Sequence, residues 1–208
     1  MALTVHRGGT VTYDLLADDV AALIQALDLD RPLIAGFSYG AITATIVGIR
    51  HPGAVRAIVN HAGYDAFDPR SPAWAMSRQM FGGSPDAIEA DPEAAARFFS
   101  QSAQMQGVFE LMKADEDNGQ GKDYWKEYLR LGFHLLTQPP GYTMQDLGAI
   151  TAPTLILVCD RDEVCSVEDG VRAYRALTVG EFAVVPNTSH IITPPLVELM
   201  VEFRGRWS

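Results

Sequence analysis

Ser38 stands in a sequence context suited to nucleophilic catalysis. Residues 36–40 read Gly-Phe-Ser-Tyr-Gly, the pattern G-x-S-x-G, between an apolar run and a helical pattern. A sharp turn from a buried strand into a helix would expose the Ser38 hydroxyl to a substrate carbonyl. Gly36 and Gly40 suit such a turn, because two backbone segments then pass too close together for side chains. The motif predicts a nucleophile, and a plain glycine-rich turn is the alternative interpretation.

His190 is the candidate general base. A serine hydroxyl needs a base, because almost none of it is ionised at its own pKa. His190 follows an apolar strand pattern and a polar turn. This places it at the carboxyl end of a predicted strand, on the edge that also carries Ser38. His61 also follows a predicted strand and could face the site. The remaining histidines are interpreted as a terminal residue, a surface or capping residue and a packing residue: His6, His51 and His134.

Asp162 is the candidate acid that would fix the tautomer of the base and stabilise its charged form. It lies in the acidic segment 159–163, directly after another apolar run. Asp160 in the same segment is interpreted as a turn residue, and a solvated acidic loop is the alternative for the whole segment. Ser38, Asp162 and His190 each follow a strand pattern. In a parallel sheet, these strand ends can converge at one edge.

The hydrophobic periodicity indicates the elements that would position these residues. Thr12 is a candidate N-cap of the first helix. Helices are expected at 12–29, 42–49, 167–177 and 196–203. Strands are expected at 33–37, 55–59, 154–158 and 182–185. Alternation of this kind predicts an α/β fold, with a parallel sheet covered by helices on both faces.

The middle of the chain follows a different pattern. Strand signals are absent from residues 64–150, whereas 93–105 and 122–137 have helical patterns. We therefore expect an α/β core formed by residues 1–63 and 151–208, with an all-helical cap inserted at 64–150. The insertion is rich in large apolar side chains, Trp74 among them. Most would pack the cap, and the remainder would line an apolar cavity above Ser38, as a lid does.

Composition narrows the classes of partner. The 208-residue chain carries a net charge of −10, which disfavours nucleic acid and anionic membranes. It has no apolar run of membrane-spanning length, and residues 1–7 lack a signal-peptide core, so a cytoplasmic location is expected. Cys159 and Cys165 are interpreted as a reduced pair, because the ligands that a metal site would add are missing. A small-molecule substrate is the expected partner.

Three segments, G-F-S-Y-G, C-D-R-D-E and N-T-S-H-I, resemble the α/β-hydrolase fold family over nearly the whole chain. The resemblance implies Ser38 as nucleophile, Asp162 as orienting acid, His190 as base and an inserted helical cap. It also implies that the backbone N–H of Tyr39 donates to the oxyanion. Esterases, carbon–carbon bond hydrolases, epoxide hydrolases and cofactor-free haloperoxidase-like enzymes are the members it looks most like.

The chain differs from that family pattern at its beginning. It resembles only the later half of the family's sheet, so the early strands are expected to be missing, with the loop that supplies a second oxyanion donor. The strand before Ser38 would then have an open edge, through which a second copy could pair. Loss of one oxyanion donor typically lowers the rate about 10² to 10³-fold.

The sequence thus predicts a serine hydrolase that cleaves a small to medium apolar ester-like substrate through an acyl-enzyme. This chemistry requires no metal and no organic cofactor. One alternative is a catalytically impaired homologue that binds a ligand or partner. A second is carbon–carbon bond hydrolysis or cofactor-free perhydrolysis on the same fold. The candidate substrate contacts are Phe37, His61, Tyr64 and Trp74.

Overall fold

The structure is a computed structural model that describes residues 11–81, 110, 135 and 137–207. The described residues fall into two compact units, divided after Ala73 and before Pro139. Residues 64–73 and 139–150 group with the first unit, so this division lies inside the predicted cap boundaries. The helices expected at 93–105 and over most of 122–137 lie outside the described residues. The all-helical cap therefore stays a prediction.

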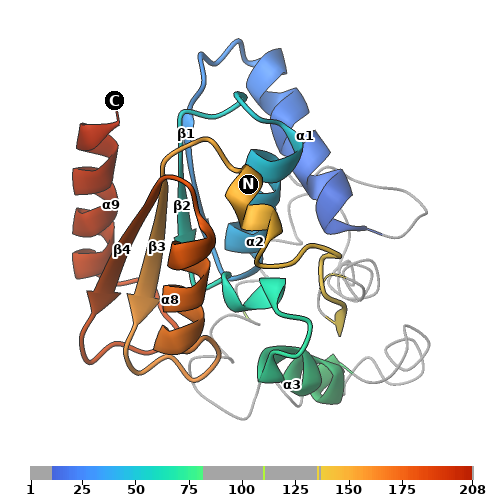
Figure 1. The fold of residues 1–208 in the computed structure, drawn as a ribbon, viewed down its shortest axis with the longest axis vertical. Coiled ribbons are helices and arrows are strands. Elements are labelled where there is room, and N and C mark those ends of the chain that lie inside the picture. Colours follow the sequence, from blue (N-terminus) through green and yellow to red (C-terminus); the bar gives the residue numbers. More distant parts are fainter. Residues whose placement is uncertain (1–10, 82–109, 111–134, 136, 208) are drawn as a thin grey trace. The chain divides into compact units, whose positions relative to one another are not determined.

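The first unit contains a four-stranded parallel sheet in the order β1-β2-β3-β4 (Figure 1). Its strands are β1 Leu33–Phe37, β2 Ala57–His61, β3 Thr154–Cys159 and β4 Gly180–Val185. Every residue of β2 and β3 is buried, as expected for central strands covered on both faces. The strand β2 begins and ends two residues later than its predicted range of 55–59, which places His61 inside the strand.

Helices cover both faces of this sheet, and the predicted fold class is confirmed (Figure 1). They are α1 Tyr13–Ala26, α2 Tyr39–Arg50, α8 Val167–Ala176 and α9 Pro194–Arg206. The helix α9 buries Leu196 and Phe203 in one apolar cluster with alternate residues of β2 and β3, including Val59. On the opposite face, α2 approaches Ile58 at Gly48, and α8 approaches β3 at Gly170.

Local signals account for the helix ends. The predicted N-cap is confirmed, since the side chain of Thr12 accepts a hydrogen bond from the Leu15 amide at 3.2 Å. The helix α1 ends at Ala26 rather than at 29, and Asp28 has a left-handed φ of 52°. Two short 3-10 helices, Asp65–Phe67 and Asp146–Ala149, also belong to this unit.

The helix α3 Pro72–Phe81 begins at the end of the first unit and continues into the second. In the second unit, the Arg78 guanidinium donates to the carbonyl of Thr137 at 3.3 Å. Within the described part of the chain, no helix combines the length and the hydrophobicity needed to span a membrane.

Candidate active site

Ser38 occupies the corner between β1 and α2, in a strained backbone conformation. Its φ of 53° and ψ of −123° lie where residues with a side chain are rarely found. The Ser38 N–H donates to the carbonyl of His61 at 2.9 Å, and the Ser38 carbonyl accepts from the amide of Ala41 at 2.9 Å. Backbone hydrogen bonds on both sides thus hold the strained residue in place.

Two glycines, one of them not expected, permit this corner. A Cβ at Gly36 would lie 2.2 Å from the carbonyl oxygen of Gly40, so the predicted need for glycine at 36 is confirmed. The same prediction for Gly40 is wrong, because a Cβ there would meet none of the described atoms within 4 Å. Gly63 supplies the second close approach, since a Cβ there would lie 2.6 Å from the Ser38 carbonyl oxygen.

The structure brings the three predicted strand-end residues into one hydrogen-bonded row. The Nε2 atom of His190 lies 3.2 Å from Oγ of Ser38. Its Nδ1 atom lies 2.9 Å from Oδ2 of Asp162. The Asp162 side chain is fully buried, whereas 16% of the His190 side chain is exposed. The imidazole therefore joins the hydroxyl of Ser38, a half-buried residue, to a carboxylate shielded from water.

The environment of Asp162 keeps its carboxylate ionised. Burial by itself raises the pKa, but the hydrogen bond from His190 and those from the backbone amides of Cys165 and Val164 outweigh it and lower the pKa below its usual value. Both amides donate to Oδ1 at 2.8 Å. An ionised Asp162 accepts a hydrogen bond from the N–H at Nδ1 of His190, which leaves Nε2 as the acceptor for Ser38. Asp160 accepts from the amide of Thr188 at 3.3 Å, in keeping with its interpretation as a turn residue.

Three side chains form a row beside this site, at the carboxyl ends of the first three strands. The Phe37 ring lies 4.7 Å from the His61 ring and 4.8 Å from the His190 ring, between centroids. The Nε2 atom of His61 lies 3.6 Å from Sγ of Cys159. Burial, together with the nearby His190, lowers the pKa of His61 to about 4, so this ring is neutral at pH 7. Burial also raises the pKa of the Cys159 thiol to about 11.

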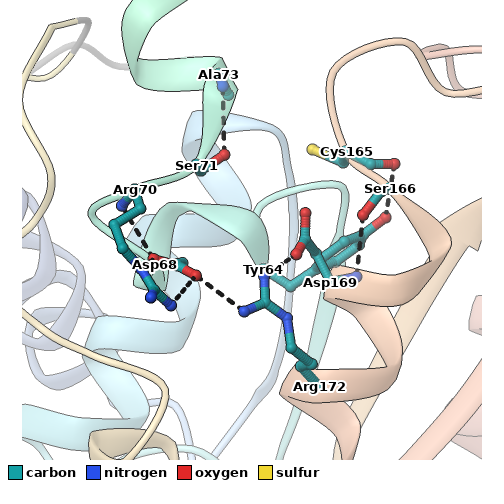
Figure 2. Close-up of polar contacts among 9 residues, drawn as sticks. All are labelled: Tyr64, Asp68, Arg70, Ser71, Ala73, Cys165, Ser166, Asp169 and Arg172. Carbon is teal, nitrogen blue, oxygen red and sulfur yellow. Dashed lines mark hydrogen bonds and ion pairs between the residues drawn. The ribbon is translucent and has the colours of Figure 1, made fainter.

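The segment that follows β2 contacts the loop that carries Asp162. Tyr64 is completely buried, and its hydroxyl donates to the carbonyl of Cys165 at 3.3 Å (Figure 2). The Cys165 thiol in turn donates to the carbonyl of Ala62 at 3.4 Å. Asn60 accepts from the amide of Gly63 at 3.1 Å, which fixes the turn. Residues 60–64, which we call the β2 junction, therefore hold both the corner of the predicted nucleophile, Ser38, and the loop of the predicted acid, Asp162; we call these the nucleophile corner and the acid loop.

An ion-pair network beyond the β2 junction was not anticipated from the sequence. Asp68 contacts both Arg70 and Arg172, and Arg172 also pairs with Asp169 on α8 (Figure 2). The hydrogen bonds from Arg70, backed by Arg172, hold the pKa of the Asp68 carboxyl well below its usual range. The network joins the segment leading into α3 to the helix that follows the acid loop.

The predicted substrate contacts differ in their surroundings. Phe37 contacts two imidazole rings, and His61 and Tyr64 have no exposed surface. Trp74 is buried and belongs to the second unit. Contact of these residues with a substrate stays a prediction, as does the oxyanion role of Tyr39, the first residue of α2.

The structure also describes His51 and the two cysteines, which the sequence analysis interpreted as residues outside the site. His51 follows α2, and its Nε2 atom contacts a carboxylate oxygen of Asp18 at 2.7 Å, in keeping with its interpretation as a surface or capping residue. His6 and His134 lie outside the described residues. Cys159 and Cys165 are buried and are not joined in a disulfide.

One cluster has the donor types of a metal site. Ligand atoms of Asp162, Cys165 and His190 lie within 4.8 Å of one another. Each of these residues already makes a hydrogen bond here, Asp162 to the imidazole and to backbone amides, and Cys165 to the Ala62 carbonyl. These bonds account for the cluster without a metal ion.

The fold and this geometry agree with a family model that matches residues 3–203 and is described as the alpha/beta hydrolase family. The chain belongs to this family. It is 28% identical over 189 residues to the AB hydrolase superfamily protein YisY of Bacillus subtilis (strain 168), covering 86% of this chain and 66% of YisY.

Solved structures share the fold. The esterase EaEST from Exiguobacterium antarcticum superposes with a TM-score of 0.67 at 17% identity, over 94% of this chain and 73% of the esterase. MGS-M2, an alpha/beta hydrolase enzyme from a Medee basin deep-sea metagenome library, gives a TM-score of 0.66 at 17% identity, over 96% of this chain and 74% of its own.

Proposed function

We propose that this chain is a serine hydrolase that cleaves a small to medium, apolar, ester-like substrate through an acyl-enzyme. The observation that carries the proposal is the row in which His190 lies within hydrogen-bonding distance of both Ser38 and Asp162. The two contacts place a hydroxyl, an imidazole and a carboxylate in the order of a nucleophile, a base and an orienting acid. Family membership supports the same class of chemistry.

In the first half of the reaction, Oγ of Ser38 attacks the substrate carbonyl carbon while Nε2 of His190 takes the hydroxyl proton. The carbonyl π electrons move to oxygen and form a tetrahedral oxyanion. When this intermediate collapses, the bond to the leaving alcohol breaks, and the alcohol oxygen receives the proton from His190. Asp162 stabilises the imidazolium that exists between these transfers.

In the second half, His190 removes a proton from water, and the hydroxide attacks the acyl-enzyme carbonyl. Collapse of the second oxyanion breaks the bond to Oγ, which regains its proton from His190. The carboxylic acid leaves and the free serine is restored. Proton transfers and bond changes balance without a cofactor.

The amino end of α2 supports the charge that develops on the carbonyl oxygen. Tyr39 is the first residue of this 12-residue helix, directly after Ser38. Amide groups in a first helical turn point out of the helix, and the helix dipole favours a negative charge there. The N–H of Tyr39 is therefore the oxyanion donor that we assign.

A fluorophosphonate probe tests the nucleophile directly. Intact-mass and peptide analysis should find one adduct, on Ser38, and Ser38→Ala should abolish it. Hydrolysis of p-nitrophenyl acetate and butyrate by the wild type should exceed that by Ser38→Ala by on the order of 10³-fold or more. Folded wild-type protein that neither reacts with the probe nor hydrolyses either ester would contradict the proposal.

A second assay separates this function from the alternatives. Labelling of Ser38 without turnover of any ester would favour a homologue that binds a ligand. Turnover of a vinylogous 1,5-diketone, or peroxide-dependent formation of a peracid, at a rate above ester hydrolysis would favour the carbon–carbon or perhydrolase reaction. Each result rejects the esterase assignment and keeps the fold.

A further inference from the structure

The imidazole of His61 takes no proton and touches no reacting atom in the proposed reaction, yet it stands directly beside the site. It is completely buried, and its Nδ1 atom has no hydrogen-bond partner among the described residues. An unsatisfied buried nitrogen opposes folding. Leucine would fill the space without that penalty. Space filling alone therefore does not account for a histidine here.

The flat face of the ring has a defined neighbour. His61 and Phe37 are directly opposite each other in the pairing of β2 with β1, and their ring planes are tilted by 35°. Phe37 also meets the His190 ring, at a tilt of 40°. Tilted aromatic pairs at these separations attract each other and prefer particular orientations. The orientation of the His61 ring thus restricts that of Phe37, which in turn contacts His190.

The edge of the His61 ring is anchored on the next strand. Sγ of Cys159, the last residue of β3, lies 3.6 Å from Nε2. The buried thiol keeps its proton at pH 7, so it can pair with Nε2 in either tautomer of the ring, and the contact restricts rotation of the ring. The backbone of His61 contributes as well, since its carbonyl accepts the N–H of Ser38 at 2.9 Å. One residue therefore contacts the nucleophile corner through its backbone and the base through one intervening ring.

We propose that His61 is a positioning residue, which holds Phe37 against the imidazole of His190 and so keeps Nε2 aligned with the hydroxyl of Ser38. Its kinetic consequence rests on the proposed hydrolase function, whereas the alignment itself can be observed without turnover. Misplacement of a catalytic group by about 1 Å is enough to lower a rate about 100-fold. Loss of a supporting ring should produce a smaller change in the same direction.

His61→Leu is the decisive variant, because leucine fills a similar volume without a flat aromatic face. We expect it to lower kcat for p-nitrophenyl butyrate about tenfold while KM changes less than about twofold, since a shifted base impairs the chemical step rather than binding. His61→Phe restores an aromatic face and should recover most of the loss. Val59→Ala, a buried change two residues earlier in β2, should lower stability and leave kcat unchanged.

Proton NMR can report the alignment of the His190 imidazole independently of activity. The proton on Nδ1 of His190, shared with the Asp162 carboxylate, should give a far-downfield signal, which His190→Gln removes. We expect a sharp signal in the wild type, in Val59→Ala and in His61→Phe. In folded His61→Leu, the signal should be broadened or displaced.

The outcomes separate this inference from the proposed function. A wild type without esterase activity, whose downfield signal still responds as described, would overturn the function and leave the positioning role standing. A His61→Leu protein with wild-type kcat, or with an unchanged signal, would overturn the positioning role. If His61→Leu fails to fold, Phe37→Leu replaces it, because that change removes the intervening ring and should disturb the same signal.

Discussion

A Cβ atom at residue 63 would lie 2.6 Å from the carbonyl oxygen of Ser38, so the β2 junction and the nucleophile corner are in contact as bare backbone. Gly63→Ala should therefore force one of the two segments to move. We expect the free energy of unfolding, measured with urea, to fall by about 1–3 kcal/mol. Ester hydrolysis should fall with it, because the displaced segment carries the strained serine.

Gly40→Ala is the matched control for this change. A Cβ at residue 40 meets none of the described atoms within 4 Å, and the residue lies in the first turn of α2. Alanine is favoured over glycine in helices by up to about 1 kcal/mol. Equal losses of stability in the two variants would contradict the steric argument.

Asp162→Asn tests the orienting acid. The amide would no longer select the tautomer of His190 that presents a free acceptor to Ser38. We expect kcat to fall on the order of 10⁴-fold, as for the equivalent change in other Ser-His-Asp sites. Asp160→Asn, in the same loop, should leave kcat within a few-fold. A fall of similar size in both variants would mean that the loop, and not the carboxylate, is needed.

Asp68→Asn tests the ion-pair network by its pH dependence. The hydrogen bonds from Arg70 and Arg172 hold the pKa of Asp68 in the folded protein below its usual value of 3.8. A carboxyl of this kind stabilises the fold above its unfolded pKa, and this contribution is lost as the pH falls below that value. Urea unfolding from pH 7 to about pH 2.5 should therefore show a smaller acid-induced loss of stability in Asp68→Asn than in the wild type.

The control for the network is Asp30→Asn, whose side chain is 97% exposed in the wild type. It removes the same formal charge without breaking the contact between Asp68 and Arg172. Its unfolding free energy should follow the wild-type pH curve. A curve for Asp68→Asn that also parallels the wild type would show that the network adds no stability.

The edge of β1 leads us to predict that two copies of the chain associate. In the part of the chain that the structure describes, β1 pairs with β2 alone, and Ala35 at its centre is exposed. We expect a second copy to pair through this strand, weakly at low salt because of the net charge of −10, and more strongly as salt screens that charge. Sedimentation velocity should detect this trend, and Ala35→Lys should weaken it. A monomer at every salt and protein concentration would contradict it.

Much of the fold could be predicted from local pattern. Apolar runs bounded by proline and glycine located all of the described strands, because buried parallel strands are continuous apolar segments. The errors lie at the ends. The strand β2 was placed two residues early, since Val55 is as apolar as the strand residues and is also buried, but the pairing begins at Ala57. The predicted hydrolase family is confirmed.

The candidate site could be predicted only in part. Ser38, Asp162 and His190 share a recognisable position, each within five residues of the end of a strand, and the topology of a parallel sheet brings such positions together. The contact between Asp68 and Arg172 joins residues 104 positions apart and has no local signature. Gly63 resembled any turn glycine, because the backbone that it touches belongs to a different segment. Contacts of this kind depend on the folded arrangement, which periodicity does not report.

The hydrogen bond from the N–H of Ser38 to the carbonyl of His61 has a consequence for how this site can be dissected. Both atoms belong to the main chain, so alanine replacement of Asn60, His61 or Tyr64 removes neither the donor nor the acceptor, and such a scan undervalues the segment. Semisynthesis offers a way to measure it, since an amide-to-ester replacement between residues 37 and 38 deletes the donor and preserves every side chain. The difference in unfolding free energy between that ester-containing protein and the wild type would measure a backbone contribution that side-chain substitutions leave untouched.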